Sequence, residues 1–170
     1  MPSIHVCPLS RLPETLAQTG ANRLMTLMKV GTAIARPDGI AAGHHCVVEV
    51  SDIVAPLDGH VLPDDAHIGA ILDFSRSWDR ARPLVIHCYA GISRSTAAAY
   101  IAACALEPER DEAAIADALR AAAPSATPNS LFVAIADRML ARDGRMVAAI
   151  ARIGRGAEAF EGEPFRLDLA

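Results

Sequence analysis

Two residues of this sequence, Cys88 and Arg94, are of types that together could hold and attack an anion. They lie in the stretch LVIHCYAGISRST (Leu84–Thr96), with five residues between them. A cysteine thiolate is a strong nucleophile, and the planar guanidinium of arginine can bind two phosphate oxygens at once. The spacing lets a short loop curl until both side chains meet at one phosphate group.

The segments around this pair should give the loop a phosphate-binding shape. LVIHC is typical of a buried strand, and a helix is expected from Arg94 to Leu106. A loop between a strand and a helix start directs backbone N–H groups and the positive end of the helix dipole to one point. Gly91 lets the backbone turn, and Ser95 can donate a hydrogen bond to the sulfur. The residues expected to bind phosphate are Tyr89, Ala90, Gly91, Ile92, Ser93 and Arg94.

The stretch HCYAGISRS (His87–Ser95) resembles the phosphate-binding loop of the protein tyrosine phosphatase superfamily. Its Ala-Gly-x-Ser-Arg-Ser form is most similar to the dual-specificity branch. VVEVSDI (Val47–Ile53) and PNSLF (Pro128–Phe132) resemble two further segments of that branch, in the same order. The resemblance implies a metal-free mechanism without a cofactor, in which Cys88 forms a phosphocysteine and an aspartic acid protonates the leaving oxygen.

Two aspartates are candidates for this general acid. Asp52 directly follows VVEVS, where the resemblance places the acid, and we expect that strand to run beside LVIHC. Asp58 lies further along the same polar loop, in an Asp-Gly pair that turn formation alone explains. Asp52 is the favoured candidate, and Asp58 remains the alternative.

The length and patterning of the chain favour one α/β phosphatase domain over residues 1–170, with three layers and a mostly parallel sheet of four or five strands flanked by helices. Strands are expected at Ser3–Cys7, Arg23–Met28, Cys46–Val50 and Leu84–Cys88. Helices are expected at His67–Trp78, Arg94–Leu106, Asp111–Ala123, Ser130–Arg142 and Arg145–Ile153, so that the chain ends in helices.

The net charge and the hydrophobic pattern of the chain argue against several classes of partner. The net charge is −4 and no basic stripe is present, which disfavours nucleic acid. The longest apolar run, Ala97–Leu106, is about half of what a membrane span requires. The first residues do not resemble a signal peptide, so the cytoplasm is the expected location.

Neither the remaining cysteines nor the histidines form a recognisable site. The four cysteines show no C-x-x-C pair, although Cys46, on a strand expected beside the catalytic one, could form a protective disulfide with Cys88. A metal site is disfavoured because no pair has the His-x-x-x-His spacing. The residues that could suggest one are His44, His45, His60, Asp64, Asp65 and His67; Asp64 and Asp65 are explained as helix caps.

The expected activity is hydrolysis of a phosphate monoester, with a tyrosine-directed or dual-specificity protein phosphatase favoured. A small-molecule phosphatase, a rhodanese-like sulfurtransferase and a phosphate-binding pseudophosphatase are the alternatives. The rhodanese loop is one residue shorter, which argues against a sulfurtransferase. Cys88, Arg94 and a candidate acid are all present, which argues against a pseudophosphatase. Tyr89, Ile92 and Ser93 are not basic, which disfavours phosphoinositides. Phosphate or sulfate is expected to fit the loop.

Overall fold

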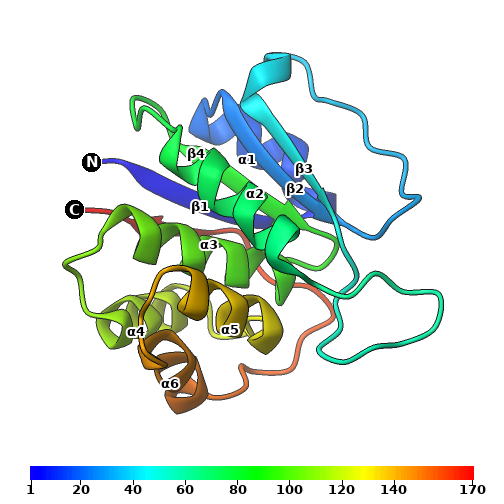
Figure 1. The fold of residues 1–170 in the computed structure, drawn as a ribbon. Coiled ribbons are helices and arrows are strands. Elements are labelled where there is room, and N and C mark those ends of the chain that lie inside the picture. Colours follow the sequence, from blue (N-terminus) through cyan, green and yellow to red (C-terminus); the bar gives the residue numbers. More distant parts are fainter.

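The protein is described by a computed structural model covering residues 1–170, built around a five-stranded sheet. The strand order is β3-β2-β4-β1-β5 (Figure 1). Four strands are parallel, and β5 pairs antiparallel with β1. The strands are β1 (Ser3–Pro8), β2 (Arg23–Met28), β3 (His45–Glu49), β4 (Leu84–Cys88) and β5 (Phe165–Asp168).

Helices cover both faces of the sheet, as the α/β expectation requires. One face is covered by α1 (Leu12–Thr19), and the other by α2 (Asp65–Arg76) and α3 (Arg94–Leu106). Helices α4 (Glu112–Ala122) and α5 (Ser130–Met139) pack on the outer side of α3, and α6 (Arg145–Ile153) packs on α4 and α5 (Figure 1). No helix combines the length and apolar character needed to cross a membrane.

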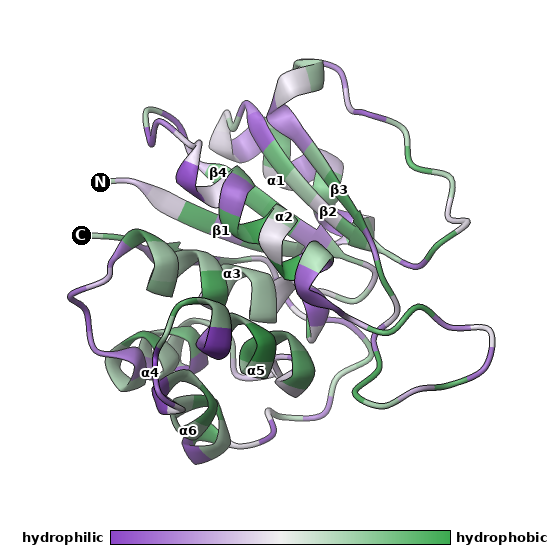
Figure 2. Ribbon diagram, in the orientation of Figure 1, coloured by the Kyte–Doolittle hydropathy of each residue, from purple (hydrophilic) through white to green (hydrophobic).

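The side chains of β4 alternate between the two faces, which decides where the candidate catalytic residues point. Leu84, Ile86 and Cys88 belong to the larger core on the side of α3. Val85 packs in the smaller core beneath α1. Figure 2 shows hydrophobic residues concentrated on the strands and on α3 and α5. Helix α3 is buried from Ser95 to Cys104, and its many alanines allow the sheet and the neighbouring helices to approach it closely.

The expected elements are confirmed within a few residues at their ends, with two exceptions. The chain does not end in helices, because Phe165–Asp168 forms β5 along the edge of β1. The expectation that the strand before Asp52 runs beside LVIHC is also wrong, because β2 lies between β3 and β4. The loop that carries both candidate acids, residues 50–64, contains no helix or strand, as expected.

The same strand order rules out the disulfide considered between Cys46 and Cys88. The two strands are separated by two strand spacings, about 9.6 Å, whereas the Cα atoms of a disulfide lie within about 7 Å. All four cysteines are free in the structure.

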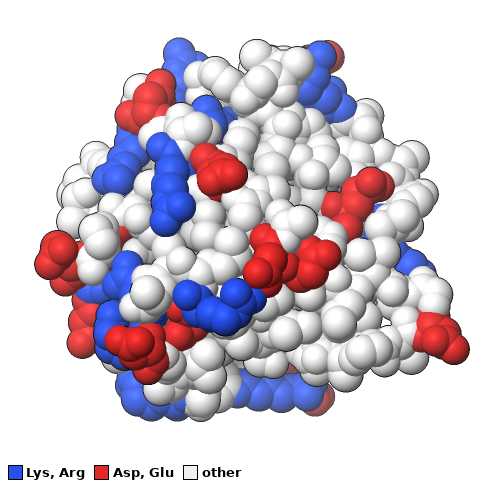
Figure 3. Space-filling model, viewed as in Figure 1, with Lys and Arg blue, Asp and Glu red and all other residues white.

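Charged side chains of both signs are interspersed on the face drawn in Figure 3, and neither sign forms a continuous stripe there.

Candidate active site

The loop between β4 and α3 leaves the sheet at its centre. Strand β4 lies between β2 and β1, so residues 89–93 emerge at the carboxyl edge with strands on either side. Open α/β sheets bind ligands at this edge. Cys88, the last residue of β4, is only 2% exposed.

The Cys88 sulfur is held by two groups from the loop and the helix start. The N–H of Gly91 donates to Sγ at 3.2 Å, and Ser95 Oγ lies 3.1 Å from it. Gly91 has a φ of +68°, and a Cβ atom on it would lie 2.7 Å from the backbone nitrogen of Pro8. Only glycine therefore permits this turn so close to β1.

Neighbouring segments bind the outer side of the loop through its carbonyl groups. Backbone N–H groups donate to four of these carbonyls, and the pairs are Leu9 to Tyr89 (3.0 Å), Gly162 to Ala90 (2.8 Å), Thr127 to Ile92 (2.9 Å) and Asn129 to Ser93 (3.3 Å). The loop N–H groups of Tyr89, Ala90, Ile92 and Ser93 have no acceptor within the protein. A loop with most of its carbonyl groups occupied and most of its N–H groups free is suited to hold an anion.

Arg94 connects this loop to the segment that carries the candidate acids. Its Nη1 donates to the carbonyl oxygen of Val50 at 3.1 Å. Its Nε is buried and has no partner. A buried donor without an acceptor is costly, and an oxygen of a bound phosphate would satisfy it.

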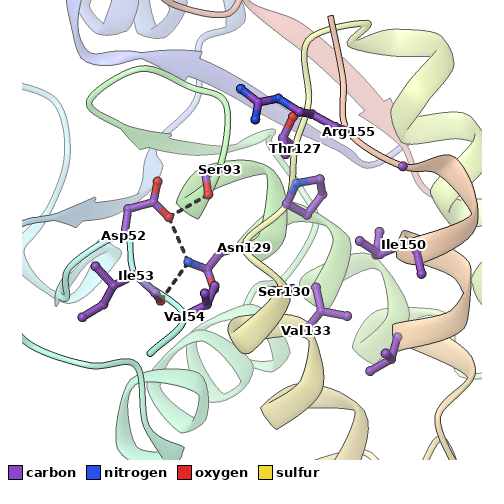
Figure 4. Close-up of a pocket in the computed structure, with 14 residues that line it drawn as sticks. Asp52, Ile53, Val54, Ser93, Thr127, Asn129, Ser130, Val133, Ile150 and Arg155 are labelled. Atoms are coloured by element: carbon purple, nitrogen blue, oxygen red, sulfur yellow. Dashed lines mark hydrogen bonds between the residues drawn. The ribbon is translucent and has the colours of Figure 1, made fainter. Parts of the chain in front are cut away.

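Asp52 is bonded directly to the loop, and Figure 4 shows the arrangement. Its Oδ1 accepts from Ser93 Oγ at 2.7 Å and from Asn129 Nδ2 at 2.9 Å. Asn129 Nδ2 also donates to the carbonyl of Ile53, while its Oδ1 caps α5. Oδ2 of Asp52 makes no hydrogen bond, so this oxygen is free to carry and transfer a proton.

Asp58, the alternative acid, makes no side-chain hydrogen bond to this network. It is exposed, within a turn whose ends are held by Ser51 and Val61. The N–H of Ser51 donates to the carbonyl of Val61, and the N–H of Val61 donates to Ser51 Oγ, both at 3.0 Å. Asp52, and not Asp58, is therefore hydrogen-bonded to the Cys88 loop.

His87 supports the loop from the other face of the sheet. Its Nδ1 lies 3.3 Å from the carbonyl oxygen of Cys88, and its Nε2 lies 2.8 Å from Thr26 Oγ1. Burial lowers the pKa of His87 to about 4, so the ring is neutral at neutral pH and serves to orient the loop.

The other cysteines are set apart from this chemistry by burial. Burial raises the pKa of Cys7 and of Cys46 to about 11, and that of Cys104 to about 12. All three are therefore protonated thiols at neutral pH.

The residues considered for a metal site are not brought together. No group of three or more His, Cys, Asp or Glu side chains gathers in the structure. Asp64 and His67 instead form a capping box at the start of α2, in which Asp64 Oδ1 accepts from the N–H of His67.

The contribution of Asn129 to this site was not visible in the sequence. The Pro-Asn pair indicated only the start of a helix, and Asn129 does cap α5. Its bond to Asp52 joins residues 77 positions apart, and no local pattern predicts such a pair.

Comparison with known proteins identifies the fold. No family model and no curated protein matches the chain. Among solved structures, DUSP15 matches with a TM-score of 0.65 and 15% identity, over 89% of this chain and 92% of that one. The chain has the fold of the dual-specificity phosphatases. Human DUSP28 matches with a TM-score of 0.62 and 20% identity, over 84% of this chain and 94% of that one.

A mouse protein described as a dual specificity phosphatase matches with a TM-score of 0.56 and 20% identity, over 80% of this chain and 79% of that one. The fold expected from HCYAGISRS is thereby confirmed. A phosphatase fold does not by itself imply the activity, which depends on the side chains at the site.

Proposed function

We propose that this protein hydrolyses phosphate monoesters through a phosphocysteine formed on Cys88. The observation that carries the proposal is the loop of free N–H donors with the Cys88 sulfur at its start. The buried, unpartnered Nε of Arg94 lies at the other end of the same loop. This set of donors complements a phosphate dianion, and it lies in front of a nucleophile.

In the first step, the Cys88 thiolate attacks phosphorus opposite the leaving oxygen. The S–P bond forms as the P–O bond breaks, and the proton on Asp52 Oδ2 passes to the leaving oxygen. The loop N–H groups and Arg94 hold the other three phosphate oxygens. Such preorganised donors stabilise the charge of the transition state.

In the second step, water attacks the phosphorus of the phosphocysteine. The Asp52 carboxylate accepts a proton from this water, and the S–P bond breaks to release inorganic phosphate and the thiolate. Ser95 Oγ, 3.1 Å from the sulfur, donates a hydrogen bond that stabilises the departing thiolate. Asp52 is then protonated again for the next cycle.

The substrate class that fits best is a phosphorylated protein, modified on tyrosine or on serine or threonine. None of Tyr89, Ile92 and Ser93 offers a further cation for a headgroup with several phosphates. A nucleophilic thiol and three further free cysteines fit a reducing compartment such as the cytoplasm.

The experiment that tests the proposal is the substitution Cys88→Ser. Turnover of phosphotyrosine, phosphoserine and small phosphate esters is measured with a chelator present. We expect turnover to disappear while orthovanadate still binds, because the N–H donors and Arg94 remain. Cys46→Ser, at a half-buried cysteine outside the site, is the matched control and keeps turnover. Full activity in Cys88→Ser, or wild-type activity that depends on added zinc, contradicts the mechanism.

A further inference from the structure

A pocket of about 530 Å³ lies directly beside the Asp52–Ser93 pair. Its walls come from the loop that carries Asp52, from residues 127–130 and 133, and from α6 with the residues that follow it. Figure 4 shows Val133 and Ile150 on the side of the pocket opposite Asp52. Because Ser93 belongs to both the pocket and the Cys88 loop, and Asp52 lines the pocket while accepting from Ser93, a group in the pocket lies next to a phosphate in the loop.

The walls of this pocket are largely aliphatic. The apolar side chains are those of Ile53, Val54, Val133, Val147, Ile150 and Ala151. Val54 is 58% exposed and Val147 is 42% exposed, so part of this apolar surface faces water. The volume falls within the range of about 300–1,000 Å³ typical of ligand pockets.

Arg155 provides a cation at the border of the pocket. Its guanidinium lies 3.7 Å from Glu158, and the two side chains are 78% and 90% exposed. An ion pair this exposed is weak, so Arg155 can exchange Glu158 for another carboxylate. Arg155 also borders a smaller hollow of about 250 Å³ that again includes Asp52 and Ser93.

We propose that this pocket binds an aliphatic side chain close to the phosphorylated residue of a protein substrate, and that Arg155 pairs with a carboxylate of the same substrate. The inference rests on the proposed function and names its substrate class. A peptide supplies a phosphate, an aliphatic side chain and a carboxylate along one short segment, which matches the loop, the pocket and Arg155. A small phosphate ester fills the loop alone.

The test compares phosphotyrosine peptides with p-nitrophenyl phosphate. In the peptides, each position flanking phosphotyrosine carries leucine, glycine or glutamate in turn. We expect kcat/KM to fall about tenfold or more when leucine at one flanking position is replaced by glycine, in line with the value of a well-filled apolar pocket. Glutamate at a nearby position should raise kcat/KM about two- to fivefold relative to glycine at that position. Arg155→Ala should abolish that gain. Arg152→Ala is the matched control, because Arg152 pairs with Asp117 instead.

A second variant fills the pocket directly. Ala151→Trp places a large side chain at an exposed position of α6 that lines the pocket. It should lower kcat/KM for the leucine peptide about tenfold more than for p-nitrophenyl phosphate. Ala148→Trp, on the same helix but at an exposed position outside this pocket, should leave the ratio of the two values unchanged.

The outcomes separate this inference from the proposed function. Equal kcat/KM values across the peptide set would overturn the inference, and so would an unchanged ratio of kcat/KM for the leucine peptide to that for p-nitrophenyl phosphate in Ala151→Trp. In either case, hydrolysis of p-nitrophenyl phosphate would still support the proposed phosphatase activity. A wild-type preference for small phosphate esters over all peptides would also overturn it. A wild-type protein that hydrolyses neither kind of substrate would overturn both.

Discussion

Replacing His87 with asparagine should change how the stability of the protein depends on pH. His87 is 2% exposed, and burial lowers its pKa from 6.5 to about 4 in the folded protein. The unfolded chain therefore binds a proton in this range that the folded protein excludes. The free energy of unfolding should be unaffected by His87 above about pH 7 and should fall as the pH drops from 6.5 towards 4.

The size of this effect follows from the two pKa values. A difference of about 2.5 pKa units corresponds to about 3.4 kcal/mol once His87 is fully titrated. Between pH 7 and pH 5 the contribution is about 2 kcal/mol. His87→Asn removes this contribution, although it also lowers stability at pH 7 because the bonds to Cys88 and Thr26 are disturbed.

The assay is urea unfolding at pH 7 and pH 5 for the wild type and the variant. We expect the wild type to lose about 2 kcal/mol more than His87→Asn over this interval. Exposed His60 provides the control, and His60→Asn should follow the wild type. Equal losses in the wild type and His87→Asn would refute the reasoning that burial keeps the ring neutral.

Three further predictions concern the site. Asp52→Ala should slow hydrolysis of alkyl phosphates far more than that of an activated aryl phosphate and flatten the alkaline limb of the pH–rate profile; the same pattern in Asp58→Ala alone would assign the acid to Asp58. Gly91→Ala should lower kcat/KM by about 10² or more, because its Cβ meets β1 at 2.7 Å. Gly39→Ala, with a similar positive φ but open space around its Cβ, should retain activity in the same assay. Asn129→Ala should destabilise the protein by about 1 kcal/mol in urea unfolding, because the cap of α5 is lost. Asn129→Asp should keep the cap but slow the hydrolysis of substrates with poor leaving groups, because a second carboxylate then faces Asp52. Wild-type kinetics in Asn129→Asp would mean that Asn129 does not position the acid.

The parts of the site that lie in one continuous segment could be predicted from the sequence. The LVIHC strand, the glycine turn and the start of α3 are set by local preferences of the residues between Leu84 and Leu106. The strand before Asp52 and the start of a helix near Ser130 were predicted from the residues of each segment.

The relations between segments could not be predicted, because they depend on the whole fold. Placing β3 beside β4 assumed that the two site-bearing strands are neighbours, whereas β2 takes that position. Strand β5 has only four residues, too few for an alternating pattern to stand out. The bonds that Leu9, Gly162 and Thr127 make to the loop carbonyls likewise join distant positions.

The Thr26 hydroxyl fixes the direction of a chain of hydrogen bonds behind the loop. The carbonyl of Cys88 can only accept, so His87 Nδ1 carries the proton of that bond. The neutral ring then has no proton on Nε2, which accepts from the hydroxyl of Thr26. Since this hydroxyl has a single proton, His45 Nε2, 2.9 Å from Thr26 Oγ1, must be the donor. The tautomer of a half-buried histidine on β3 is thus set by the backbone of the proposed nucleophile, three hydrogen bonds away.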